Sequence, residues 1–324
     1  MFSYLIRRLC LSVPIVFGVM LLTFVLFFVV QSPQAMARKV LGPKATPQAV
    51  ENWLQNRGYD KPLLVNTVPG RPFYDSLFFN QMRRLASFDL GRSDVTGRPL
   101  KEVFAKGVLP SLLITVPAFV VGLVSALGLA LYLVFVRHSS VDLAAALVCV
   151  GLMSLPSMAY VIFGQYVVAQ QLNYLPAFGF SLEGGSAVRF LVLPVALMVV
   201  SGLGAEVRLY RALFLEEMGQ DYIRTARAKG LSNAAVLMVH VLKNGMINLI
   251  TLVVASLPFL MMGSLVVENF FGIPGLGSVL FSAIQAPDFA VVQASVFLGS
   301  ILYLIGLMLT DLCYAWVDPR IRLQ

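Results

Sequence analysis

The acidic residues that could do chemistry in this chain lie at the ends of long apolar runs. Glu206, Glu268, Asp288 and Asp311 all have such positions. A charge inside a bilayer is costly, and ion-coupled carriers keep one only where it serves a relay or an ion site. Because no acidic residue lies at the centre of a run, the sequence offers no candidate proton relay.

Other kinds of reactive site are equally hard to find. A phosphate-binding loop needs a glycine-rich turn followed by Lys and Ser/Thr, but none of the seven lysines directly follows a glycine. His138 and His240 match neither a metal site nor a catalytic triad, and Cys10, Cys149 and Cys313 lie in or beside apolar runs without a CxxC spacing. We therefore expect no catalytic residue, no metal and no cofactor, so energy for uphill movement would come from another subunit.

Residues 221–231 (DYIRTARAKGL) form a basic segment rich in small residues between long apolar runs. A helix-forming run closed by Gly230 and followed by Ser232, a good N-cap, predicts a short helix, a sharp stop and a second helix. We expect Tyr222 and Ile223 to face outward, as in a helix that docks into a partner's groove. A membrane-surface helix attracted by anionic lipid is the alternative on composition.

The composition indicates an integral membrane protein, in which helices would position these residues. Of its 324 residues, 58% are hydrophobic and only 12% are charged, whereas soluble domains are about a quarter charged. The net charge of +8 does not point to nucleic acid, because the basic residues form no dense tract.

Charge-free runs predict six membrane spans, and thus an all-α polytopic membrane protein. The first run would be about 33 Å long as a helix, which matches a bilayer core. It is also too long for a signal peptide, so we expect an uncleaved anchor although Ala35-Met36-Ala37 imitates a cleavage site. The third run has room for one span and an interfacial stretch, and the fourth is expected to continue to Leu209. The runs are 9–30, 107–136, 143–182, 190–205, 244–267 and 289–310.

The sequence divides into residues 1–31 with the first span, an insert at 32–106, and a five-span core at 107–324 with a loop at about 210–243. The short loops on one side carry eleven basic residues, and those opposite carry only Arg189. By the positive-inside rule both termini and the loop 210–243 are cytoplasmic. The insert is expected to face outward, because long segments translocate largely regardless of charge, and to hold two or three short helices, including 49–57 and 73–86.

Polar residues in and after the fifth span are candidates for a solute pathway. Asn248, Ser256 and Ser264 recur at intervals of eight residues, which suits a pathway lining or interhelical hydrogen bonds. Glu268 could hold the following glycine-rich turn or meet a cationic group of a solute. Pro117, Pro156, Pro194 and Pro258 interrupt spans two to five, either as packing features or as hinges.

Four stretches of the chain resemble one known family. Residues 221–231 with 240–244 (HVLKN) are similar to the cytoplasmic "EAA" loop of binding-protein-dependent ABC importer permeases, in the form found in the dipeptide/oligopeptide/nickel class. Residues 1–9 (MFSYLIRRL) resemble the start of the B-type permease subunit, 268–277 (ENFFGIPGLG) resemble its loop between spans five and six, and 318–322 (DPRIR) resemble its tail.

The resemblance implies a type I ABC importer permease in a bacterial inner membrane. Its partners would be a second homologous permease in a heterodimer, two ATP-binding subunits and a periplasmic or lipid-anchored solute-binding protein. The chain would then form the translocation pathway of an ATP-driven importer for peptides or a similar small solute. The coupling surface for the ATP-binding subunits would be Tyr222, Ile223, Arg224, Thr225, Ala226, Arg227, Ala228, Lys229, Gly230 and Leu231.

Some points stay open at this stage. The Glu-Ala-Ala of the wider family reads Arg224-Thr225-Ala226 here, and no proline follows Leu242. The substrate could be a dipeptide, an oligopeptide, an antimicrobial peptide, a nickel chelate or haem. The insert either contacts the binding protein and narrows the pathway mouth or only caps the helix ends. The alternatives in function are a gradient-driven secondary carrier or channel, and a non-transporting membrane scaffold.

Overall fold

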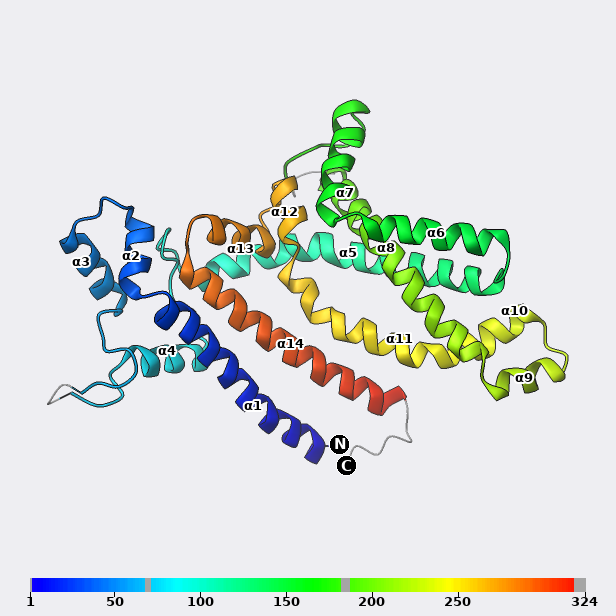
Figure 1. Cartoon of the computed structure of the whole chain (residues 1–324), viewed down its shortest axis with the longest axis horizontal. Coiled ribbons are helices and arrows are strands. Elements are labelled where there is room, and N and C mark those ends of the chain that lie inside the picture. Colours follow the sequence, from blue (N-terminus) through cyan, green and yellow to red (C-terminus); the bar gives the residue numbers. More distant parts are fainter. Residues whose placement is uncertain (1, 68–70, 182–186, 318–324) are drawn as a thin grey trace. The chain divides into compact units, whose positions relative to one another are not determined.

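The computed structural model describes residues 2–67, 71–181 and 187–317. The tail at 318–322 therefore lies outside the described residues, as does Leu182 at the end of the third apolar run. Within the described ranges the secondary structure is helical (Figure 1), with one isolated bridge between Arg92 and Pro99. The fold is all-α, as the sequence predicts.

The chain forms two compact units. We call residues 1–108 and 278–305 the insert unit, and residues 109–277 and 306–323 the core unit. The insert unit thus combines the N-terminal part of the chain with a segment from near its C-terminal end.

Three short helices of the insert unit begin at capped positions. The side chains of Ser32, Thr46 and Ser76 each accept a hydrogen bond from the backbone N–H three residues on, which satisfies a donor that the helix leaves open. The three helices confirm the predicted two or three, although the third begins at Leu77 and not at Phe73, because Ser76 caps it. They follow α1 (Phe2–Phe24) and its π-helical extension (Val25–Val30), and they are α2 (Pro33–Leu41), α3 (Pro47–Arg57) and α4 (Leu77–Ala86).

Aromatic side chains form the core of the insert unit. Phe24 stacks on Phe28 with ring centroids 5.2 Å apart, and Tyr59 meets both Phe28 and Trp53 edge to face. Buried Leu77 adds an aliphatic contact from α4. This cluster fixes the short helices to the end of the first span.

Seven further helices account for much of the rest of the described chain. α5 begins in the insert unit and continues in the core unit after residue 108. α14 begins in the insert unit and ends in the core unit. The bounds are α5 (Leu100–Phe135), α6 (Ser140–Ser154), α7 (Ser157–Gly164) with a π-helical extension (Gln165–Gln171), α8 (Ala187–Met218), α11 (Leu242–Ser256), α13 (Leu276–Gln285) and α14 (Phe289–Val317).

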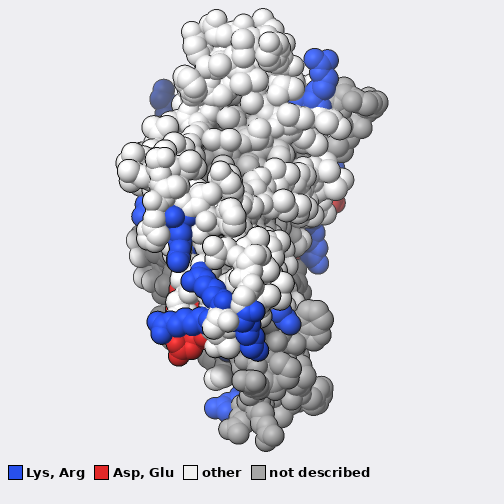
Figure 2. Space-filling model, turned by 90° about the vertical axis from the view of Figure 1, so that its right-hand side faces the viewer, with Lys and Arg blue, Asp and Glu red and all other residues white. Residues whose placement is uncertain are grey.

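Among the described residues, five helical segments are long and apolar enough to cross a bilayer, and a bent pair of helices makes a sixth if it is counted as one span. Their outer faces carry exposed apolar side chains such as Leu143 (66% exposed) on α6 and Val13 (64% exposed) on α1. Figure 2 shows a surface on which large areas carry no charged side chain. These observations fit the predicted six spans. The segments are Cys10–Val30, Leu100–Phe135, Ser140–Ser154 with Ser157–Gln171, Val188–Met218, Asn248–Phe271 and Phe289–Cys313.

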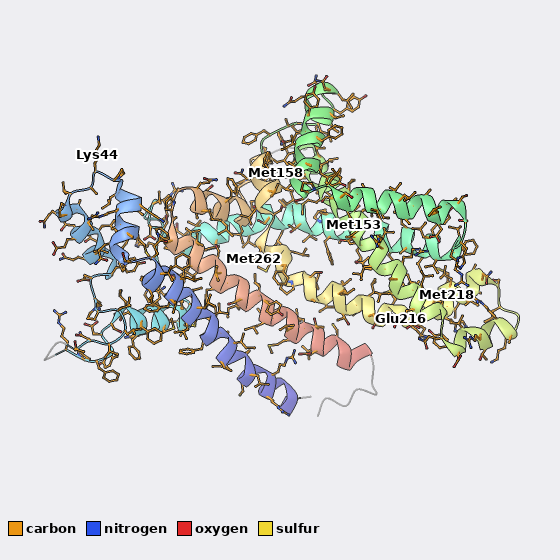
Figure 3. All side chains as sticks on the ribbon, in the orientation of Figure 1. Lys44, Met153, Met158, Glu216, Met218 and Met262 are labelled. Carbon is orange, nitrogen blue, oxygen red and sulfur yellow. The ribbon has the colours of Figure 1, made fainter. Side chains whose placement is uncertain are left out.

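The third span is broken into two helices, whereas we had expected one continuous span. α6 and α7 meet at 91°, and Met153 and Met158 lie on the two sides of the break (Figure 3). Leu155 between them is extended, because a residue before proline avoids the helical region, and Pro156 has no N–H to continue the helix.

The fourth span continues well past its predicted end at Leu209. α8 reaches Met218, and Glu206 and Arg208 therefore lie within a helix of about 48 Å, longer than a bilayer core. Arg211 on this helix forms an ion pair of 2.8 Å with Asp142 at the start of α6. The end of α8 is thereby tied to the turn between α5 and α6.

Candidate functional site

The segment 221–231 folds as a helix, a stop and a second helix, which confirms the prediction. α9 (Asp221–Ala228) ends where the N–H of Gly230 bonds to the carbonyl of Arg227 over 2.9 Å. The Ser232 side chain then caps α10 (Asn233–Ala235), which continues as π-helical turns (Val236–Val241) into α11. We call residues 221–241 the coupling loop, after the role that the resemblance implies for this segment.

Gly230 is required by the backbone conformation and not by a lack of space. Its φ is +82°, in the left-handed region that side chains with a Cβ resist. A Cβ at this position would have no other atom within 4 Å. A substitution there would strain the turn without a steric clash.

The inner face of α9 packs on the core unit. Ile223 is 0% exposed and Ala226 is buried, in a cluster with Phe214, Val236 and Val241. The expectation that Ile223 faces outward is therefore wrong. Residues three apart share one face of a helix, and in this short helix that face is the one that anchors the loop.

The remaining residues of the segment form its outer face. Tyr222 is 37% exposed and Leu231 is 42% exposed, while Arg227 is half-buried. This end of the molecule is turned to the viewer in Figure 2, where Lys and Arg side chains lie around a small acidic patch. The exposed set is Tyr222, Arg224, Thr225, Ala228, Lys229, Gly230 and Leu231.

Two interactions on this face set its electrostatics. Arg224 pairs with Asp221 at 3.3 Å, but both side chains are almost fully exposed, so the pair adds little stability. The Tyr222 hydroxyl donates to the carboxylate of Glu217. Partial burial raises the pKa of Tyr222, and the bond to Glu217 raises it further, so this hydroxyl remains a donor at neutral pH.

Sequence reasoning missed the residues that hold the loop on the neighbouring helices. Glu217, which accepts from Tyr222, lies in the last turn of α8, next to Glu216 and Met218 (Figure 3). The sulfur of Met218 is 3.9 Å from Nη2 of Arg227. A stretch of mixed charge does not indicate which of its residues faces the loop, so only the fold could identify these contacts.

The fifth span does not place Asn248, Ser256 and Ser264 on one helix. α11 ends at Ser256, a 3₁₀-helical turn (Leu257–Met262) with Pro258 near its start follows, and Gly263 has a φ of +70°. The regular interval of eight residues is therefore not a regular interval in space. Asn248 is exposed, and the pathway role of these residues stays a prediction.

The two serines make local backbone contacts. Ser256 donates to the carbonyl of Val253 over 2.7 Å. Ser264 accepts from the N–H of Val267 and caps α12 (Leu265–Phe271). Both hydroxyls thus stabilise the break in the span.

Glu268 on α12 is 0% exposed and holds the glycine-rich turn. Its Oε1 accepts from Ser111 Oγ over 2.7 Å and from the N–H of Ser264 over 3.1 Å. A Cβ on Gly263 or Gly275 would collide with the carboxyl group. Of the two roles weighed for Glu268, the structure supports the holding of the turn.

The described residues contain no group of three or more His, Cys, Asp or Glu side chains placed to hold a metal ion. Cys149 is buried in the core unit, while Cys10 is exposed.

Comparison with known proteins covers most of the chain. Residues 108–323 match the family model described as "Binding-protein-dependent transport system inner membrane component", and residues 1–83 match the model of the N-terminal region of such membrane components. Relatives include the glutathione transport system permease protein GsiC of Escherichia coli (strain K12) and that of Shigella flexneri serotype 5b (strain 8401). Each is 30% identical over 322 residues, which cover 99% of both chains.

The matched regions contain both the coupling loop and the break of the fifth span that precedes Glu268. Together with the six apolar spans, they identify the chain as a member of the binding-protein-dependent transport system inner membrane components, the permease subunits of ABC-type importers.

Proposed function

We propose that this permease forms the translocation pathway for short peptides and peptide-like solutes of about the size of glutathione. Two relatives that match it end to end are named as glutathione transport system permease proteins.

In this proposal ATP hydrolysis takes place in two partner subunits, and the chain itself is not an enzyme and holds no cofactor. A second homologous permease completes the pathway, and a periplasmic or lipid-anchored binding protein delivers the solute. Both termini and the coupling loop face the cytoplasm, since the short loops on that side carry the basic residues.

The observation that carries the proposal is the two-sided coupling loop. Ile223 and Ala226 fix it to the core unit, while Arg224, Lys229 and Leu231 remain exposed for a partner. A loop held on one face can transmit a partner's movement to the helices behind it. α8 and α11 would carry this movement to the pathway, and ATP shifts the equilibrium between inward and outward states by binding one of them more tightly.

The test is uptake of labelled glutathione and of labelled dialanine into proteoliposomes that contain the complete complex. We expect uptake only when ATP is enclosed with the ATP-binding subunits and the binding protein is present outside. A complex with Arg224→Ala and Lys229→Ala should lose most of this uptake although it inserts normally. Uptake that a protonophore abolishes at constant ATP would instead support a gradient-driven carrier.

A further inference from the structure

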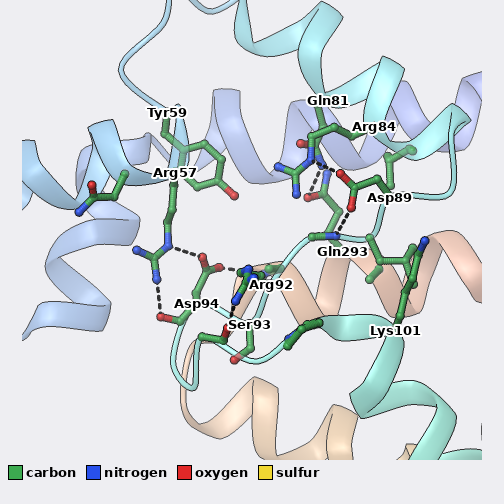
Figure 4. Close-up of a pocket in the computed structure, with 18 residues that line it drawn as sticks. Arg57, Tyr59, Gln81, Arg84, Asp89, Arg92, Ser93, Asp94, Lys101 and Gln293 are labelled. Carbon is green, nitrogen blue, oxygen red and sulfur yellow. Dashed lines mark hydrogen bonds and ion pairs between the residues drawn. The ribbon is translucent and has the colours of Figure 1, made fainter.

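The insert unit contains a cavity of about 610 Å³ to which no role has yet been given. Its walls come from the end of α3, from α4, from the turn at 89–99 and from the first turns of α5 and α14. Figure 4 shows their polar side chains pointing toward one another around this space. A volume of this size is within the range of small-molecule sites, about 300–1,000 Å³.

Basic groups outnumber acidic groups in the lining. Arg57, Arg84, Arg92 and Lys101 are basic, and Asp89 and Asp94 are acidic.

The buried acid is already engaged. Asp94 accepts from Arg57 Nε and from the N–H of Ala290, each over 2.9 Å. Asp89 is exposed and lies 3.6 Å from Arg84, too far for a strong pair. No hydrogen bond or ion pair joins the Lys101 side chain to another residue that the structure describes. The cavity therefore retains an excess of positive charge.

A buried amide adds an unused donor. Gln293 is only 5% exposed, and its Oε1 accepts from Gln81 over 2.9 Å. Its Nε2 is buried with no hydrogen-bond partner among the described residues. A buried donor without a partner is unfavourable, so an acceptor placed there would be bound favourably.

The Tyr59 side chain supplies a further polar group to the wall. Burial raises the pKa of Tyr59, so its hydroxyl stays protonated across the physiological range and can donate. Cationic and neutral donors thus converge on one space, while the nearby carboxylates are exposed or already bonded.

We infer that this cavity binds the carboxylate group of a small, peptide-sized organic acid. Guanidinium groups and amide N–H donors suit a carboxylate, whose oxygens accept several hydrogen bonds at once. A cavity lined by five segments also suits a small solute better than it suits a protein partner with a flat surface. The inference goes beyond the proposed function, because it adds a solute site in the insert unit, outside the coupling loop and the break of the fifth span.

The test compares two probes that differ only in the charged group. N-acetyl-trialanine carries one carboxylate, and N-acetyl-trialanine amide carries none. Binding to the complete complex in nanodiscs is measured by calorimetry without nucleotide and without binding protein. We expect the acid to bind at least about tenfold more tightly, since a hydrogen bond to a charged group contributes roughly 1.5–3 kcal/mol.

Matched variants locate the site. Arg92→Gln and Lys101→Gln remove charges from the lining, while Arg98→Gln and Lys106→Gln remove the same charges from the same turn and the same helix outside the lining. The lining variants should each weaken binding of the acid about tenfold, and the controls should leave it unchanged. Gln293→Glu keeps the acceptor for Gln81 but replaces the free donor with a carboxylate, and it should abolish binding.

Several results would overturn the inference. They are equal binding of acid and amide, equal effects of lining and control variants, displacement by inorganic phosphate at equal strength, and binding that needs the binding protein. Fluorescence of Trp53, which lies against Arg57, is measured on the separately purified chain in a Trp316→Phe background and checks that each variant retains a folded insert unit. ATP-driven uptake is a separate measurement, so failure of the cavity and failure of the importer are distinguishable.

Discussion

Ser111 Oγ lies 2.7 Å from Glu268 Oε1, and both residues are completely buried. The same hydroxyl accepts from the N–H of Leu276 over 2.8 Å. One side chain on α5 therefore connects α12 to the start of α13. The glycine-rich turn between these helices is held at both ends. Ser111 holds the end at Leu276. Glu268 holds the other end, because its backbone carbonyl accepts from the N–H of Ile273 and its carboxylate accepts from the N–H of Ser264.

Ser111→Ala should destabilise this arrangement. It leaves the Leu276 N–H without its acceptor and removes a donor from a buried carboxylate, which costs about 1–3 kcal/mol for each bare group. Thermal unfolding of the purified chain should show a lower midpoint than for Ser256→Ala, whose hydroxyl bonds only to its own helix. Equal midpoints for the two variants would contradict a joining role of Ser111.

Gly230→Val should weaken coupling to the ATP-binding subunits without blocking membrane insertion. A φ of +82° costs a β-branched residue about 1–2 kcal/mol or more, although no atom stands in the way. Gly230→Asn is the matched control, because asparagine tolerates the left-handed region. Substrate-stimulated ATPase activity of the complex should fall for valine and persist for asparagine. Wild-type substrate-stimulated ATPase activity of the complex with Gly230→Val would contradict this prediction.

The sequence predicts those parts of the fold that follow from local chemistry. The stop at Gly230 and the cap at Ser232 depend on neighbouring residues, and the spans depend on length and apolar character, so both could be foreseen. The break at Leu155 also has a local cause in Pro156. A proline can either kink or end a helix, however, and the angle of 91° depends on packing.

The parts that could not be predicted depend on pairs far apart in the sequence. Ser111 is one polar residue in an apolar run, and nothing near it indicates that Glu268 will lie beside it. Ile223 has the residue type of either a docking face or a buried anchor, and only the cluster around Phe214 decides between them. The cavity near Gln293 likewise joins α14 to a turn almost 200 residues earlier in the chain.

Ile223→Ala and Arg224→Ala should separate anchoring from contact with the partner. Loss of the fully buried isoleucine side chain should cost about 2–5 kcal/mol and lower the unfolding midpoint of the chain. Arg224 is exposed, so its removal should leave the midpoint unchanged and reduce co-purification of the ATP-binding subunits. A lower unfolding midpoint for Arg224→Ala, or an unchanged midpoint for Ile223→Ala, would contradict the two-sided loop.

The stability of the insert unit should depend on the protonation of Asp94. Burial raises the pKa of Asp94, more than the hydrogen bond from Arg57 lowers it, and Asp288 nearby raises it further. The folded pKa then lies above the unfolded value of about 3.9. Protonation therefore favours the folded state, and this contribution is fully present below about pH 3.9 and is lost as the pH rises through the folded pKa.

Asp94→Asn removes this titration and keeps a side-chain oxygen to accept from Ala290. We expect the unfolding midpoint of the wild-type chain to fall relative to that of Asp94→Asn as the pH rises from 4 to 7. Trp53 and Trp316 are the two tryptophans of the chain, so a Trp316→Phe background makes Trp53 fluorescence a direct report on the insert unit. Parallel midpoints would show that Asp94 does not titrate in this range. If the wild-type unfolding midpoint instead rises relative to that of Asp94→Asn with rising pH, the ion pair with Arg57 outweighs the cost of burial.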